Sequence, residues 1–147
     1  MRRSSILVLV TILTAACSST AILPTAPSAA GGSSALTADQ LIGTWQLHSI
    51  QAAGQGQQAR PAGAAYTLTF SADRVSTRVD CNSCSGSYSI AGSTLTVSDA
   101  MACTRAACPT MAFEQVYTSL LGGQHTIEVN DSVLILTSAR GELRFMR

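Results

Sequence analysis

The sequence predicts a mostly β (α+β) fold: a single small domain of about seven or eight antiparallel strands with one helix. Short segments between Leu41 and Met146 alternate apolar and polar residues and are separated by turns rich in Gly, Ser, Asn and Asp. Only one segment has the period of a helix. Because most connections are short, we expect neighbouring strands to be antiparallel, in a curved sheet or a small barrel with the helix over one opening.

The strands are predicted from their period-2 alternation. Trp45 and Leu47 share one side of the first, and a long polar loop, 51–65, follows it. The turn 71–73 joins the next two predicted strands, 66–70 and 74–80, into a hairpin. The predicted strands are 41–50, 66–70, 74–80, 88–90, 95–97, 126–129, 133–137 and 142–146.

The period changes after Thr110, which can act as an N-cap. The apolar residues then recur with helical spacing and form one face, and Gly122 and Gly123 can end the helix. The residues of this face are Phe113, Val116, Tyr117, Leu120 and Leu121.

The N-terminus has the pattern of a signal peptide over residues 1–16. Arg2 and Arg3 precede an apolar run, 6–13, that is far shorter than the roughly 20 residues of a membrane span. The segment LTAAC resembles the bacterial lipobox, which implies acylation of Cys17 and a lipid anchor in a membrane. Ser18, directly after Cys17, resembles the sorting signal of lipoproteins that are sent to the outer rather than the inner membrane. The domain is then expected on the periplasmic side of that membrane. The alternative is an ordinary signal peptide whose Cys17 is unmodified.

Composition separates a tether from the domain and excludes several functions. Residues 17–37 are nearly all Ser, Thr, Ala, Gly and Pro, which cannot bury a core, so the domain is expected at 38–147. Without Arg2 and Arg3, seven arginines face eight acidic residues, which does not favour binding to nucleic acid. The sequence has no Lys, so a Walker phosphate loop, a Schiff-base lysine and a Ser-Lys pair are excluded.

The order of motifs resembles the META domain (HslJ-like) family of bacterial envelope lipoproteins. The segments that carry the resemblance are LIGTWQL, YTLTFSADRVSTRVDCNSCSGSYSI and LTVSDAMACTRAACP, with the Cys-Asn signature at Cys81 as the most specific part. The resemblance implies a single mostly antiparallel domain without known enzymatic activity, linked to envelope integrity or stress tolerance. It implies no catalytic residues and no cofactor.

The five cysteines fit an exported protein, since acylation of Cys17 leaves four that can pair. Cys81-x-x-Cys84 and Cys103-x4-Cys108 could form disulfides, a zinc site or a redox centre, and an oxidising compartment favours disulfides. Three pairings are open from the residues alone. Many members of the family that the sequence resembles have only two of these cysteines, at the positions of Cys81 and Cys108. The resemblance therefore implies a disulfide between Cys81 and Cys108, with a second one between Cys84 and Cys103 nested inside it.

Other polar and aromatic residues have structural interpretations. His48 and His125 are expected at the surface or rim, and Asn82 is expected to bond to a turn backbone. Trp45, Tyr66 and Tyr88 are candidates for the core or for the lining of a barrel pocket.

We therefore expect a non-catalytic protein that contacts another envelope component or stabilises the envelope under stress. The alternative is a barrel for a small hydrophobic ligand, because Gly43-x-Trp45 also resembles the lipocalin pattern. A proteinase-inhibitor barrel is a third possibility, and a hydrolase is the least favoured.

Overall fold

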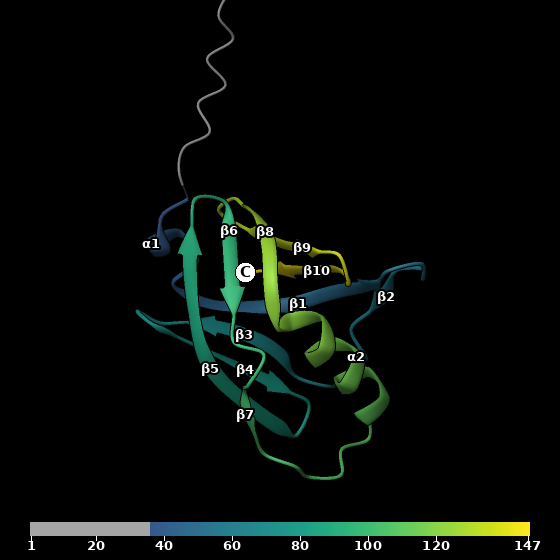
Figure 1. Cartoon of the computed structure of the whole chain (residues 1–147). Helices are drawn as coiled ribbons and strands as arrows, with labels where there is room; N and C mark the ends of the chain where they lie inside the picture. The colour runs from purple at the N-terminus through teal and green to yellow at the C-terminus, as the bar shows by residue number, and fades with distance from the viewer. Residues whose placement is uncertain (1–35) are drawn as a thin grey trace, which may run out of the picture. The chain divides into compact units, whose positions relative to one another are not determined.

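Eight antiparallel strands close into a barrel in the computed structural model, which describes residues 36–147 (Figure 1). The barrel order is β1, β3, β4, β5, β6, β8, β9 and β10, and β10 pairs with β1 to close the ring. The predicted fold class is confirmed. The predicted signal peptide, the predicted lipidation site at Cys17 and nearly all of the predicted tether lie outside the described residues.

The strand bounds follow the alternating segments closely. The barrel strands are β1 (Gly43–Ala52), β3 (Tyr66–Phe70), β4 (Arg74–Val79), β5 (Asn82–Ala91), β6 (Thr94–Val97), β8 (Gly123–Val129), β9 (Val133–Ser138) and β10 (Gly141–Met146). Two short strands lie outside the ring: β2 (Gln58–Ala59) pairs with β1, and β7 (Ala102–Cys103) pairs with β5.

The alternation of each strand fills the barrel from all sides. In β3 the apolar Tyr66, Leu68 and Phe70 are buried, whereas the threonines between them are partly exposed. Where the ring closes, Gly141 has φ +144° and lies so close to the backbone of Gln51 that an added Cβ would clash with it. Closure therefore needs a glycine at this position.

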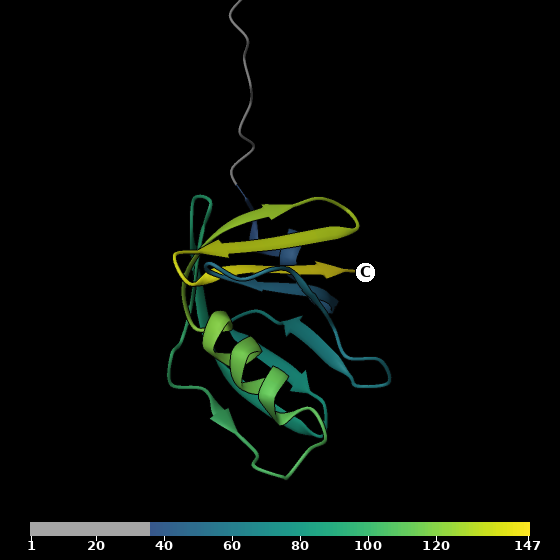
Figure 2. The ribbon, with the colours of Figure 1, turned by 90° about the vertical axis from the view of Figure 1, so that its right-hand side faces the viewer.

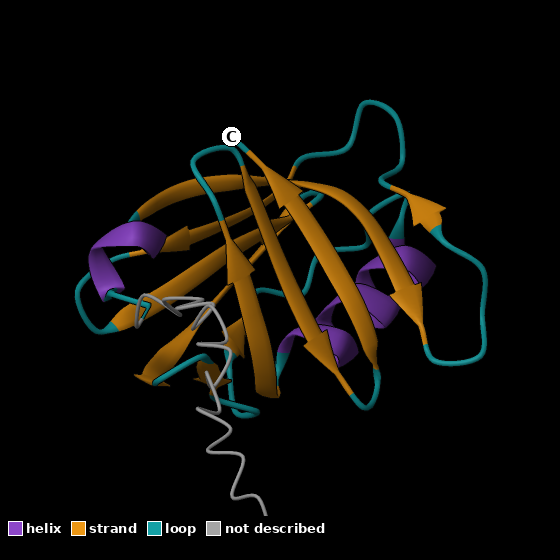
Figure 3. Ribbon diagram, turned by 90° about the horizontal axis from the view of Figure 1, so that it is seen from above, coloured by secondary structure: helices purple, strands orange, loops and turns teal. Residues whose placement is uncertain are grey.

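The two helices lie at the ends of the barrel (Figures 2 and 3). Helix α2 (Met111–Leu121) covers one end, and its Tyr117 ring packs edge-on against Tyr66 of β3 and Phe145 of β10. Helix α1 (Ala38–Leu41) lies at the other, where the indole Nε1 of Trp45 donates a hydrogen bond to the carbonyl of Leu41 at 2.9 Å.

Several local features differ from the sequence-based prediction, among them β8, which begins at Gly123 rather than at 126. Leu41 belongs to α1 rather than to the first strand, and the short strands β2 and β7 were not predicted. Strand β5 begins at Asn82, well before the predicted start at 88, because it pairs along the whole of β4. Its first half has Ser, Cys and Gly in place of an apolar alternation, so the period-2 signal is missing there.

Candidate functional site

The aromatic residues proposed for the core or for the lining of a pocket pack inside the barrel. Trp45 and Tyr66 are 0% and 1% exposed, and Trp45 is covered by the guanidinium of Arg147, 3.9 Å from its ring centroid. Tyr88 is half-buried, packs edge-on against Phe70 and donates a hydrogen bond to the carbonyl of Ser71 at 2.7 Å. These contacts make the interior a packed core, which leaves the outside of the barrel for a binding site.

Two disulfides tie the segment between β6 and α2 to the barrel. Cys81 is bonded to Cys108 and Cys84 to Cys103, which is the nested pairing that the family resemblance implied. With all four sulfurs bonded, the described residues retain no cysteine thiolate for zinc or redox chemistry. Residues 36–147 also contain no cluster of three or more His, Cys, Asp or Glu suited to a metal ion.

Asn82 joins this segment to helix α2 from a buried position, with 2% of its surface exposed. Its side-chain oxygen accepts hydrogen bonds from the backbone N–H of Ala106 at 2.7 Å and from the hydroxyl of Thr104 at 3.1 Å. Its side-chain nitrogen lies 3.0 Å from the Ala106 carbonyl and 3.2 Å from both carboxylate oxygens of Glu114. Asn82 therefore bonds to backbone groups, as expected, but these belong to Ala106, 24 positions further on, rather than to its own turn, and it also bonds to Glu114, 32 positions further on.

Asp80 fixes the start of α2 in a similar way. Its carboxylate accepts hydrogen bonds from the hydroxyl and the backbone N–H of Thr110, at 2.7 and 3.2 Å, and the Thr110 hydroxyl also lies 2.7 Å from the Tyr66 hydroxyl. Thr110 is the N-cap residue as predicted, but its side chain makes no capping bond. An acidic side chain beside the first turn of a helix complements the helix dipole.

A groove lies between this tied segment and the outer side of α2, and we call it the α2 groove. It has a volume of about 480 Å³. One wall is the segment 103–107, and the other is formed by Met111, Glu114, Gln115 and Thr118 of α2. Asn82 lies between the walls, bonded to both. Because two disulfides and a buried amide hold its walls, the α2 groove is a preformed site.

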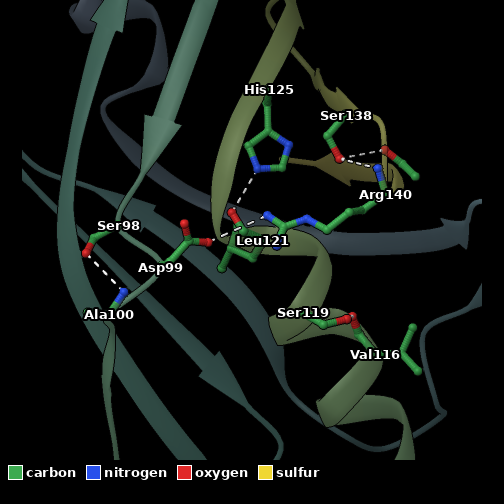
Figure 4. A network of polar contacts seen from close by, with 10 residues as sticks. Ser98, Asp99, Ala100, Val116, Ser119, Leu121, His125, Ser138 and Arg140 are labelled. Atoms are coloured by element: carbon green, nitrogen blue, oxygen red, sulfur yellow. Dashed lines mark hydrogen bonds and ion pairs between the residues drawn. The ribbon is translucent and has the colours of Figure 1, made fainter.

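The two histidines have different environments. His48 is exposed on β1. His125 is 2% exposed, so its expected surface or rim position is wrong. Its Nε2 lies 2.9 Å from the Leu121 carbonyl, and its Nδ1 has no partner among the described residues (Figure 4). Burial is the main cause that lowers the pKa of His125, and the nearby Arg140 lowers it further.

The fold and the packed interior define a class of protein: a small, closed, eight-stranded antiparallel barrel with a groove on its outer side. The model of the META domain family matches residues 39–147, and the chain belongs to this family. A search of curated proteins finds no significant match.

Solved structures share the fold. An NMR structure of a protein from Burkholderia xenovorans is 25% identical, with a TM-score of 0.61, over 75% of this chain and 85% of that one. A crystal structure of a lipocalin-like protein from Bacteroides uniformis is 18% identical, with a TM-score of 0.51, over 74% of this chain and 98% of that one. At that identity the second likeness concerns the fold alone. Across residues 36–147, no helix has the length and apolar character to cross a membrane.

Sequence reasoning did not find the α2 groove or Glu114. The groove walls come from segments that are brought together by the disulfides, and no local period reports such a contact. The available signal was the pair of cysteines at Cys103 and Cys108. Their bonds to Cys84 and Cys81 place the intervening residues beside Asn82 and the first turns of the helix.

Proposed function

We propose that this protein is a non-catalytic, lipid-anchored protein of the bacterial cell envelope that supports envelope integrity by binding another envelope component in the α2 groove. The observation that carries the proposal is the contrast between a filled barrel and a preformed groove outside it. The lipobox-like segment before Cys17 supports the anchor, and membership of the META domain family is consistent with an envelope role.

The polar contacts support a binding role rather than catalysis. Among residues 36–147, neither His48 nor His125 is hydrogen-bonded to a serine hydroxyl, a cysteine or a carboxylate. A nucleophile activated by a neighbouring base requires such a contact. The buried Asn82 and the part-buried Glu114 form the polar centre of the groove instead, in an arrangement suited to recognition.

The packed interior argues against the small-ligand alternative. Trp45, Phe70 and Phe145 are all at most 1% exposed, so a hydrophobic ligand inside the barrel would have to displace them. A titration with a hydrophobic dye, followed through the emission of Trp45, should show no saturable binding. Saturable quenching of Trp45 would restore that alternative.

The function is tested in cells that lack the gene and that express either the wild-type protein or a variant whose groove is filled by a larger side chain. Gln115 is exposed and lines the groove, so Gln115→Trp should obstruct it without disturbing the core. Glu128→Trp, on the exposed wall of β8, is the matched control. We expect deletion to raise permeability to large hydrophobic antibiotics, Glu128→Trp to restore the barrier and Gln115→Trp to fail. Equal restoration by both variants, or no effect of the deletion, would refute the proposal.

A further inference from the structure

Strand β7 offers a free backbone edge beside the α2 groove. The backbone N–H of Thr104 donates a hydrogen bond to the carbonyl of Ser83 at 3.0 Å, and Cys103 is aligned with Cys84. Backbone groups alternate in direction along a strand, so the N–H and C=O of Cys103 point away from β5. No other strand of residues 36–147 pairs with that side. Such an edge can accept an added strand.

The α2 groove runs along the segment that continues from this edge, because its wall includes each residue from Cys103 to Ala107. A second hollow, of about 450 Å³, lies over the face of β4, β5 and β7 and shares Cys103 and Thr104 with the groove. A wall made of five consecutive residues suits an extended ligand. Figure 1 shows β7 and the connection that leads from it into α2.

The walls of the groove carry one charge of each sign. Glu114 is held by the neutral amide of Asn82, and it forms no ion pair among the described residues. Arg105 is exposed on the opposite wall and is likewise without an acidic partner in that part of the chain. Met111, which is 45% exposed, adds an apolar surface. The groove therefore complements a segment that carries a basic residue, an acidic residue and an apolar residue.

We infer that the α2 groove binds an extended polypeptide segment of its partner, which adds as a strand to the free edge of β7. The segment directs a basic side chain to Glu114 and an acidic one to Arg105. The main-chain bonds to Cys103 supply affinity and the two charges supply specificity, as in other cases of strand addition. This inference rests on the proposed function and names the chemical class of the partner's contact.

The test uses the full chain, purified in detergent with its disulfides intact, and a random library of linear peptides of about ten residues. The selected peptides are then titrated against variants by fluorescence anisotropy. Glu114→Gln removes the charge but keeps an oxygen that Asn82 can bond. Glu128→Gln makes the same change on the exposed barrel wall and is the matched control. A third measurement uses peptides N-methylated at alternate residues, which cannot donate to a strand edge.

We expect selected peptides that combine basic and acidic residues and shift the amide resonances of Cys103 and Arg105. Glu114→Gln should weaken binding about fivefold, Glu128→Gln should leave it unchanged, and N-methylation in one register should abolish it. No enrichment, indifference to Glu114→Gln or tolerance of both N-methylation registers would overturn the inference. If Gln115→Trp fails in cells while peptides do not bind, the proposed function stands without strand addition. If peptides bind but Gln115→Trp restores the barrier, strand addition stands and the proposed function falls.

Discussion

The side-chain oxygen of Asn82 accepts a hydrogen bond from the backbone N–H of Ala106, with 2.7 Å between the oxygen and the nitrogen. The same amide bonds to the Ala106 carbonyl and to the carboxylate of Glu114. A single buried residue at the start of β5 therefore holds both walls of the α2 groove. The hydrogen bonds of a buried amide are costly to lose, because its partners are left without replacements.

Replacement of Asn82 should destabilise the domain more than replacement of an exposed asparagine. We expect Asn82→Ala to lower the free energy of unfolding by about 2 kcal/mol, since Ala106 and Glu114 lose a buried partner. Asn130→Ala is the control, because Asn130 bonds only to its own exposed turn. Its cost should stay below about 1 kcal/mol. Urea unfolding with the disulfides intact measures both, and equal losses would contradict the role of Asn82.

The two disulfides should each stabilise the domain, but less than either would alone. They span sequence separations of 27 and 19, and each shortens the loop that the other closes. In the loop-entropy model, removal of one bridge with the other intact costs about 2.5 kcal/mol. Cys81→Ala with Cys108→Ala, and Cys84→Ala with Cys103→Ala, should therefore have similar effects in denaturant unfolding. A negligible loss for either pair would show that its bridge does not form.

Stability should fall as the pH is lowered from 7.5 to 5, because of His125. Burial lowers the pKa of the folded His125 below the ordinary value of 6.5, and both Arg140 and Asp99 act on it (Figure 4). Below pH 6.5 the unfolded chain therefore binds a proton that the folded chain does not, until the pH reaches the lower folded pKa. One such group contributes a slope of at most about 1.4 kcal/mol per pH unit.

The contribution of His125 is isolated by a pair of substitutions. His125→Gln should flatten the pH dependence of the unfolding free energy, whereas His48→Gln, at an exposed position, should leave it unchanged. A slope that persists in His125→Gln would assign it to the carboxylates instead.

The anchor is predicted to depend on the sulfur of Cys17. In a bacterial host, the wild-type chain should incorporate radiolabelled palmitate and sediment with membranes, since acyl chains hold a protein at a bilayer through their buried methylenes. Cys17→Ala should do neither. A Cys17→Ala chain that still sediments with membranes would refute the lipid anchor. The paired substitution Cys17→Ser tests whether the thiol itself is needed.

The sequence predicted those parts of the fold that have a local periodic signal. The strand 66–70 was predicted with the bounds of β3, and the apolar face from Phe113 to Leu121 located α2. The first half of β5 has no such signal because Ser, Cys and Gly stand where apolar residues would alternate, although it pairs with the adjacent β4. The two-residue β7 has none because its pairing with β5 depends on the bond between Cys84 and Cys103. The burial of His125 was missed because the predicted strand began at 126, whereas β8 begins at Gly123 and places His125 on the same buried side as Ile127.

The candidate site was less predictable than the fold. Asn82 was recognised only as a residue of the signature, because its partners Ala106 and Glu114 lie far along the chain. Trp45 and Tyr66 were candidates for either the core or the lining of a pocket. The total volume of the inward-facing side chains determines which of the two they form. The number of large side chains directed inward leaves no space in the barrel, and this is a property of the closed ring rather than of any one strand.

The central claim is that the α2 groove is a preformed site held by Asn82, and amide hydrogen exchange tests it most directly. Ala106 and Ala107 are both exposed, but only the Ala106 N–H has a hydrogen-bond acceptor among residues 36–147. The account predicts slow exchange at Ala106, fast exchange at Ala107, and fast exchange at both in Asn82→Ala. Equal, rapid exchange of the two amides in the wild-type protein would contradict it.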